Sequence, residues 1–202
     1  MSVDKWAQTD LAIHDLIRRR WSPRAFGDRM PDAATLRRLF EAARWAPSAY
    51  NEQPTRFIIA TKAQPMDYVR LLEVLVERNQ DWARTAPILM LTVTRTTFTH
   101  NGKPNRHAWH DAGLALAHFI LQATAEGLHV HPMAGFKPDV ARERYAIPPE
   151  FEPVAAVAVG YLGPVEAIPE ALRSMETAAR TRRPIGVYAQ HWESPADTIL
   201  NA

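Results

Sequence analysis

The stretch Arg18-Arg-Arg-Trp-Ser-Pro-Arg-Ala-Phe26 places four arginines within seven residues, and the rest of the chain is best understood from it. It closes a segment in which Leu11, Leu16 and Ile17 recur at helical spacing. A phosphate monoester carries about −1.5 to −2 charges, and the guanidinium fork matches its oxygens two at a time. The stretch therefore suits a phosphate. It equally suits a solvated basic helix end, where arginine favours the helix dipole.

Composition indicates one domain with a substantial core. The chain has 202 residues, of which 47% are apolar. The 24 basic residues nearly balance the 22 acidic ones, so the overall charge requires neither a nucleic acid nor a membrane surface as partner. There is no cysteine, which excludes thiolate nucleophiles and fits a reducing compartment. Residues 1–10 lack an apolar signal core, and no apolar run reaches about 18 residues. We expect a soluble cytoplasmic protein.

Helical periodicity predicts four helices. The first begins with Asp32 as its cap and ends near Ala46, because Pro47 disfavours helical geometry in the residue before it. The second spans 66–79, with Val69, Leu72, Leu75 and Val76 facing inward. A long central helix over 108–126 ends at the capping residue Gly127, and a short helix covers 138–145.

Four apolar segments predict strands, at 57–61, 88–93, 129–131 and 154–161. Helices and strands mix without regular alternation, so we predict an α+β fold with a central sheet and helices packed on it. Residues 162–202 are poor in core pattern and contain a second basic group, Arg180-Thr-Arg182-Arg183-Pro184. We treat 1–202 as a single domain and 162–202 as an arm of it.

The loop Pro47-Ser-Ala-Tyr-Asn-Glu-Gln-Pro54 carries a hydroxyl and two carboxamides between two prolines. A carboxamide presents a donor and an acceptor together, which suits the edge of a heterocycle. The same groups could instead satisfy the backbone of a turn. The sequence does not decide between these alternatives.

Several catalytic classes find no support. The sequence contains no P-loop, no Gly-x-Gly-x-x-Gly dinucleotide motif and no Gly-x-Ser-x-Gly elbow. Metal sites at His107, His110 and Asp111, or at His129 and His131, lack the helix motif of zinc hydrolases, so we interpret these histidines as surface or core residues. Because no side chain stands out as a nucleophile or an acid–base pair, an enzyme of this sequence needs a cofactor for its chemistry.

Four motifs in order resemble the FMN-dependent nitroreductase family over about residues 11–188. They are Arg20-Trp-Ser-Pro-Arg-Ala-Phe26, Glu41-Ala-Ala-Arg-Trp-Ala-Pro-Ser-Ala-Tyr-Asn-Glu-Gln-Pro54, His131-Pro-Met-Ala-Gly-Phe136 and Arg180-Thr-Arg-Arg-Pro184. Asp111-Ala-Gly113 and 156–161 fit the same pattern. The resemblance implies a mainly antiparallel central sheet flanked by helices, and a homodimer in which the C-terminal arm reaches around the partner.

The resemblance also implies a role for each motif residue. The FMN phosphate and ribityl chain would be held by Arg20, Trp21, Ser22 and Arg24, with Arg180 and Arg182 approaching from the tail. The partner subunit would line the flavin with its Pro47, Ser48, Ala49, Asn51 and Gln53. Asn79 would contact the pyrimidine edge, and the flavin ring would lie against Pro132, Met133, Ala134 and Gly135. Some relatives have Glu where this chain has Ala134, which changes the charge near the substrate.

The resemblance implies that NADH or NADPH passes a hydride through flavin N5 to a nitroaromatic, a quinone or a similar small acceptor. No catalytic side chain and no metal are expected. One alternative is another flavin reaction on the same scaffold, such as reductive dehalogenation or flavin breakdown, with residues 94–106 as a lid. Another is a flavin-binding or nucleic-acid-binding module without turnover, although the balanced charge argues against nucleic acid. The acceptor and the preferred nucleotide are left open.

Overall fold

The computed structural model describes residues 5–188, and its centre is a four-stranded antiparallel sheet. The strand order is β1-β2-β4-β3, with the strands at β1 (Thr55–Thr61), β2 (Ile88–Arg95), β3 (His129–Met133) and β4 (Phe151–Gly160). Each predicted strand is present. Pro132 lies in β3, which is an edge strand, where a missing backbone N–H group leaves no gap in the ladder. The α+β prediction with a central antiparallel sheet is confirmed.

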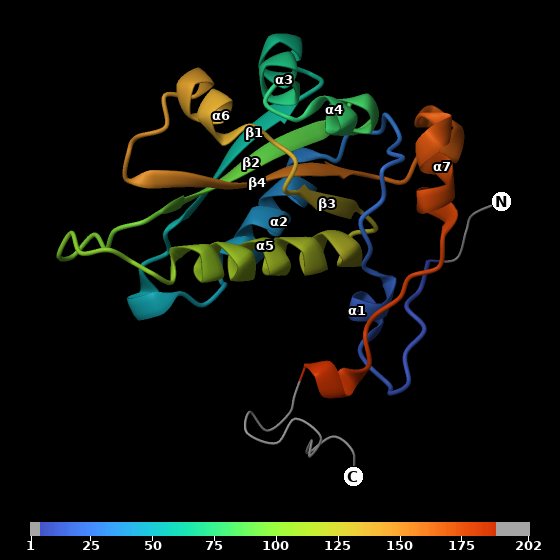
Figure 1. The fold of residues 1–202 in the computed structure, drawn as a ribbon, viewed down its shortest axis with the longest axis horizontal. Coiled ribbons are helices and arrows are strands. Elements are labelled where there is room, and N and C mark those ends of the chain that lie inside the picture. The colour runs from blue at the N-terminus through green and yellow to red at the C-terminus, as the bar shows by residue number, and fades with distance from the viewer. Residues whose placement is uncertain (1–4, 189–202) are drawn as a thin grey trace.

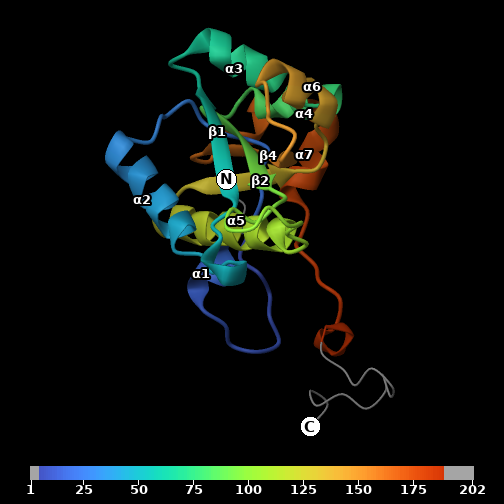
Figure 2. The ribbon, with the colours of Figure 1, turned by 90° about the vertical axis from the view of Figure 1, so that its left-hand side faces the viewer.

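Helices cover both faces of the sheet (Figures 1 and 2). One face carries α2 (Ala33–Arg44) and α5 (Ala108–Ala125), and the other carries α3 (Pro65–Leu72), α4 (Glu77–Ala83), α6 (Pro138–Arg144) and α7 (Glu170–Thr177). Each face has its own apolar cluster, around Phe119 beneath the sheet and around Trp82 above it. The remaining elements are α1 (Asp15–Arg19) and the single turns η1 (Ala49–Asn51), η2 (Val165–Ala167) and η3 (Ile185–Val187).

Two helices follow the sequence prediction closely. Asp32 caps α2, because its Oδ1 accepts from the Thr35 N–H group at 2.6 Å. The long helix α5 ends just before Gly127, whose φ of +73° is the left-handed conformation common at helix ends. Its buried face, which includes Phe119 and Ala123, packs on the sheet as expected for a central helix.

The single helix predicted over 66–79 is wrong, because the chain forms two helices there. Between α3 and α4, the Val76 N–H group donates to Gly135 O at 3.2 Å and the Lys137 N–H group donates to Val74 O at 2.8 Å. These backbone bonds to a distant loop replace the bonds of a continuous helix. The inward face also differs: Val69 is 49% exposed, and Leu71 is buried in its place.

The C-terminal segment is more closely tied to the body than its composition indicated. Ile168 and Leu172, four residues apart, enter the same apolar cluster as Trp82. Beyond α7 the chain runs away from the sheet, and η3 stands clear of the helices (Figure 2). Ile185, Val187 and Tyr188 are all exposed there. Within residues 5–188, no helix is long and apolar enough to cross a bilayer.

Candidate functional site

The arginine stretch begins as a helix and changes direction at Arg20. Helix α1 ends at Arg19, and Arg20 adopts an extended conformation with ψ of 123°. Pro23 fixes its own φ and has no N–H group, so the helix does not resume. Arg20 Nη1 donates to Ser22 Oγ at 3.2 Å, which places these two predicted phosphate ligands side by side.

The tail brings its arginines to the same place, as the sequence predicts. Burial lowers the pKa of the Arg20 guanidinium, and repulsion from Arg180 and then Arg182 lowers it further. Arg180 Nη1 donates to Lys5 O and to Arg18 O, each at 2.7 Å. Arg180 therefore ties the tail to the start of the chain and also faces Arg20.

Sequence reasoning missed a lysine and a glutamate at this place. Lys5 is only 8% exposed, its Nζ donates to Ala178 O, and it lies over the Trp21 ring at 5.0 Å from the ring centre. Burial lowers the pKa of Lys5, Glu176 opposes this, and Arg180 and Arg24 reinforce it. No local pattern marks either residue, because each lies more than 140 positions from the segment that it contacts.

We define the basic cluster as Lys5, Arg20, Arg24, Arg180 and Arg182. Glu176 is the acidic side chain beside it, and both its oxygens accept from backbone N–H groups: Arg24 at 2.9 and 3.0 Å, and Ala25 at 3.1 Å. The cations thus gather without a matching number of anions. This donor set fits a multiply charged anion such as a phosphate monoester.

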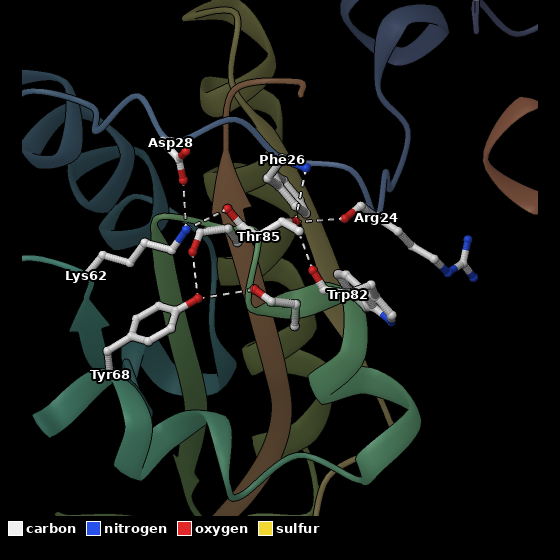
Figure 3. A network of polar contacts seen from close by, with 9 residues as sticks. Arg24, Phe26, Asp28, Lys62, Tyr68, Trp82 and Thr85 are labelled. Atoms are coloured by element: carbon white, nitrogen blue, oxygen red, sulfur yellow. Dashed lines mark hydrogen bonds and ion pairs between the residues drawn. The ribbon is translucent and has the colours of Figure 1, made fainter. Parts of the chain in front are cut away.

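The segment 23–26 is held rigidly by side chains from three other elements. Glu176 of α7 takes the two N–H groups described above, and His131 of β3 bonds Pro23 O at 2.7 Å. Thr85 Oγ1 lies 3.2 Å from both the Phe26 N–H group and Arg24 O. Figure 3 shows this last contact, with the Arg24 side chain leading away from the network. The cluster is therefore preorganised.

Two histidines line the same side of β3. His129 lies edge-on to Trp21 with ring centres 5.9 Å apart, and His131 lies against Trp82 at 4.5 Å. Burial lowers the pKa of each to about 4, and nearby arginines contribute in the same direction. Both rings are neutral at pH 7. No group of three or more His, Asp or Glu residues with metal-binding geometry occurs within residues 5–188.

The break between α3 and α4 creates a close contact between Asn79 and Gly135, both predicted flavin residues. Asn79 Nδ2 donates to Gly135 O at 2.9 Å, and Asn79 Oδ1 accepts from Trp82 Nε1 at 3.2 Å. A Cβ atom at position 135 would lie 2.5 Å from Asn79 Nδ2, so this approach requires glycine. Of the neighbouring predicted ring contacts, Met133 is buried and Ala134 is exposed.

The loop over 47–53 is strained and strongly anchored. Tyr50, Asn51 and Gln53 all have positive φ, between 50° and 55°, which is costly for residues with a side chain. The buried Asp111 accepts from the Ala49 N–H group at 3.1 Å, and Ser48 Oγ accepts from the Gln53 N–H group at 3.0 Å. Strain held in this way is common at binding sites.

The structure does not bring this loop to the basic cluster of its own chain. Figure 1 shows η1 at the N-terminal end of α5, whereas α1 and the start of the tail lie near the C-terminal end. An 18-residue helix is about 27 Å long. The loop residues therefore lie apart from the basic cluster; they are Pro47, Ser48, Ala49, Asn51 and Gln53.

Beside the loop lies an open cavity of about 280 Å³, lined by residues of α2, α5 and β1. Its walls include Phe40, Pro47 and Phe57, with Asp111 at the base of the loop. The segment proposed as a lid is a folded hairpin rather than a loose loop: the Phe98 N–H group donates to Lys103 O and the Thr99 N–H group to Glu52 Oε1, both at 2.8 Å.

Comparison with known proteins identifies the fold and the family. The nitroreductase family model matches residues 17–77 and 63–161. A solved structure described as an oxidoreductase containing FMN is 35% identical and superposes with a TM-score of 0.87, covering 95% of this chain and 98% of its own. A nitroreductase family protein of Clostridium difficile is 26% identical with a TM-score of 0.68, covering 88% of this chain and 96% of its own.

A relative from Stenotrophomonas maltophilia, provisionally named an NADH dehydrogenase/NAD(P)H nitroreductase, is 29% identical over 189 residues, which span 84% of this chain and 95% of the relative. The fold and the matched segments together define a class of oxidoreductases. This chain belongs to the nitroreductase family.

Proposed function

We propose that this chain is an FMN-dependent oxidoreductase in which NADH or NADPH is the donor and a nitroaromatic, a quinone or a similar electron-poor compound is the acceptor. The observation that carries the proposal is the basic cluster, where the two ends of the chain meet around an excess of cations. Bound FMN would supply hydride transfer at its N5 atom. The family and its FMN-containing relative support this choice of cofactor.

The residues of the basic cluster would bind the phosphate. Arg20, Arg24, Arg180 and Arg182 offer charge-assisted hydrogen bonds, and Ser22 Oγ lies next to Arg20 Nη1. Trp21 sits between Lys5 and His129, where it would cover the ribityl end. The preorganised backbone of 23–26 reduces the ordering that binding requires.

The flavin ring would lie against the end of β3 and the loop that follows it. Pro132, Met133, Ala134 and Gly135 form one side of it, and Asn79 is fixed beside Gly135 by its hydrogen bond. The chain then supplies position and electrostatics for the reaction, with no side-chain acid required. One cavity would serve donor and acceptor in turn, so we expect parallel lines in double-reciprocal plots.

The remaining half of each site would come from a second copy of the chain. The loop lies at the far end of α5 from the cluster (Figure 1), so a monomer would hold only half of a cofactor site at each end. The loop residues concerned are Pro47, Ser48, Ala49, Asn51 and Gln53. The exposed residues of η3 extend away from the body (Figure 2) and suit an arm that reaches the partner. FMN should then stabilise the dimer by mass action. We place this reaction in the cytoplasm.

Titration of apo-protein with FMN and with riboflavin, which lacks the phosphate, tests the cofactor assignment. Arg20→Ala should weaken FMN binding by about 10- to 150-fold, the value of one charge-assisted contact, and leave riboflavin binding almost unchanged. Equal weakening of both ligands would show that Arg20 is not a phosphate ligand. A colourless protein that does not bind added FMN would overturn the proposal as a whole.

Activity assays distinguish the proposed function from its two alternatives, a module without turnover and a different flavin reaction. Bleaching of flavin absorption by NADH or NADPH distinguishes the enzyme from a non-catalytic flavin-binding or nucleic-acid-binding module. The hairpin over 97–104, attached to the loop through Glu52, favours keeping reductive dehalogenation or flavin breakdown as the second candidate, since a fixed cover can select its substrate. A panel of quinones, nitroaromatics and halogenated aromatics decides between them.

A further inference from the structure

His131 has an imidazole nitrogen that the fold leaves without a partner. The residue lies on β3 (His129–Met133), directly before Pro132 in the same strand. Its ring packs against Trp82, with centres 4.5 Å apart and planes tilted by 33°. Nδ1 bonds Pro23 O at 2.7 Å. Nε2 makes no hydrogen bond within residues 5–188, and it is not fully shut off from solvent.

The hydrogen bond fixes which nitrogen carries the proton. A carbonyl oxygen only accepts, so Nδ1 must carry the hydrogen and donate it. Burial lowers the pKa of His131 to about 4; the bond to Pro23 opposes this, and Arg24 and Arg20 reinforce it. The ring is thus neutral at pH 7, and Nε2 presents a lone pair.

The position of this lone pair matters because its surroundings are rich in donors. Lys5, Arg20, Arg24, Arg180 and Arg182 have no acceptor in their side chains. They suit a phosphate, and they can donate to the hydroxyl oxygens of a polyol, but they offer no acceptor for the hydrogen that each hydroxyl group donates. Nε2 is an acceptor at the edge of the cluster, and it is held in place by the same segment that carries Arg24.

The residue also stands between the two ends of the proposed cofactor site. Pro23, which its Nδ1 holds, lies between the predicted phosphate ligands Ser22 and Arg24. Pro132, its neighbour in sequence, begins the segment 132–135 that is predicted to lie against the flavin ring. A chain that joins the phosphate end to the ring end would run near this residue.

We propose that His131 binds and positions the ribityl chain of FMN, with Nδ1–H holding Pro23 O and Nε2 accepting a hydrogen bond from a ribityl hydroxyl group. This rests on the proposed cofactor and adds a ligand that the four family motifs did not assign to it. The role is binding and positioning, since no atom of His131 takes part in the redox step.

Two amide variants separate the two nitrogens. His131→Asn places an amide N–H group near the position of Nδ1 and removes Nε2, so the bond to Pro23 can be kept while the acceptor is lost. His131→Gln places its amide near Nε2 and loses the Pro23 bond. Each apo-protein is titrated with FMN, with riboflavin and with lumiflavin, which has the flavin ring without the ribityl chain.

His131→Asn should weaken FMN and riboflavin equally, by about 2- to 13-fold for one neutral hydrogen bond, and leave lumiflavin binding unchanged. His131→Gln should regain part of the preference for riboflavin over lumiflavin, even if the protein is less stable. Unchanged affinity of the Asn variant for FMN and riboflavin would overturn the proposal. So would an equal loss for lumiflavin, which would indicate that the ring only packs against the flavin.

A nitrogen NMR spectrum of the histidine rings gives a readout independent of affinity and activity. The free protein should show His131 as the neutral tautomer with hydrogen on Nδ1, and added riboflavin should shift Nε2 in the direction of an accepted hydrogen bond. A hydrogen on Nε2 in the free protein would contradict the proposal. Wild-type protein that binds none of the three flavins would instead refute the proposed function, so the two failures are distinguishable.

Discussion

The segment 23–26 and the loop 47–53 are both held by distant side chains, but they differ in backbone strain. Segment 23–26 has ordinary backbone angles, and three other elements contribute Glu176, Thr85 and His131 to it. Loop 47–53 has three residues at positive φ, and the buried Asp111 holds it at Ala49. The first is thus fixed through many contacts within its own chain. The second stores strain, and it lies beside the cavity lined by Phe40 and Phe57 rather than beside the basic cluster of its own chain.

The difference indicates how stability and binding should divide between the two regions. Substitutions at the cluster end should lower the free energy of unfolding, because α7, β3 and the chain after α4 all meet there. Damage to the loop end should affect ligand binding more than folding. The following predictions test this division.

Acid should destabilise the cluster end most. The pKa of His129 and of His131 falls from 6.5 in a free side chain to about 4 in the fold. The unfolded chain therefore binds more protons between these values. The stability that the two neutral histidines contribute is fully present above pH 6.5 and is lost as the pH falls to 4. The upper limit is about 3 kcal/mol per histidine.

Urea unfolding at pH 7 and pH 4.5 measures this effect. A double variant, His129→Gln with His131→Asn, removes both titrating imidazole groups and serves as the control, because every carboxylate of the chain remains. The wild type should lose clearly more stability than the variant between the two pH values. Identical losses would show that these rings are not the groups that resist protonation.

Glu176→Ala should have the next largest effect. It leaves the N–H groups of Arg24 and Ala25 without their acceptor, in a place where Ala25 is only 2% exposed. Two unpaired buried donors cost about 2–5 kcal/mol. The measurement is the free energy of unfolding in urea. Glu170→Ala, an exposed position on the same helix, is the matched control and should change stability by less than about 1 kcal/mol.

Gly135→Ala should cost about 1–3 kcal/mol, because the new Cβ atom would lie 2.5 Å from Asn79 Nδ2 and displace it from Gly135 O. Gly113→Ala is the control on α5, where an added Cβ atom meets nothing within 4 Å. That variant should be more stable by up to about 1 kcal/mol, since alanine favours a helix over glycine. Thermal or urea unfolding compares the two, and equal effects would contradict the close approach at 135.

These residues also show what the sequence could and could not predict. The strands and the helices α2 and α5 follow from local periodicity and capping, as Asp32 and Gly127 illustrate. The break at Leu75 and Val76 could not be predicted locally, because its cause is a backbone pairing with residues about 60 positions later. Glu176 and His131 were missed for the same reason, since their partners lie 152 and 108 positions away. Ile168 and Leu172, at helical spacing, were a signal that α7 joins the core.

Candidate ligands were easier to predict than the side chains that hold them in place. Arg20, Ser22 and Arg180 are recognisable by residue type and by their order in the chain. The groups that fix them are ordinary side chains whose role depends on three-dimensional proximity. Side-chain type thus indicates which ligand a site suits, and long-range contacts determine whether the site is rigid.

Asp111→Ala should have the smallest effect on the fold while testing the origin of the two half-sites. It removes the acceptor of the Ala49 N–H group and should weaken FMN and riboflavin alike, by at most about 10- to 150-fold for one lost hydrogen bond to a carboxylate. Arg20→Ala should weaken FMN alone. The two variants therefore differ in ligand preference, and they can be combined in one mixed dimer.

If each site takes its cluster from one chain and its loop from the other, a dimer of one Arg20→Ala chain and one Asp111→Ala chain contains one intact site and one doubly damaged site. Separate affinity tags on the two chains allow this mixed species to be purified, and an FMN titration then reads the affinities of its two sites. One site should have wild-type affinity, and the other should bind more weakly than either single variant. If each site is instead built within one chain, neither site is intact, and the titration should show one site with the affinity of each single variant. Such a result would contradict the separation of the two half-sites along α5.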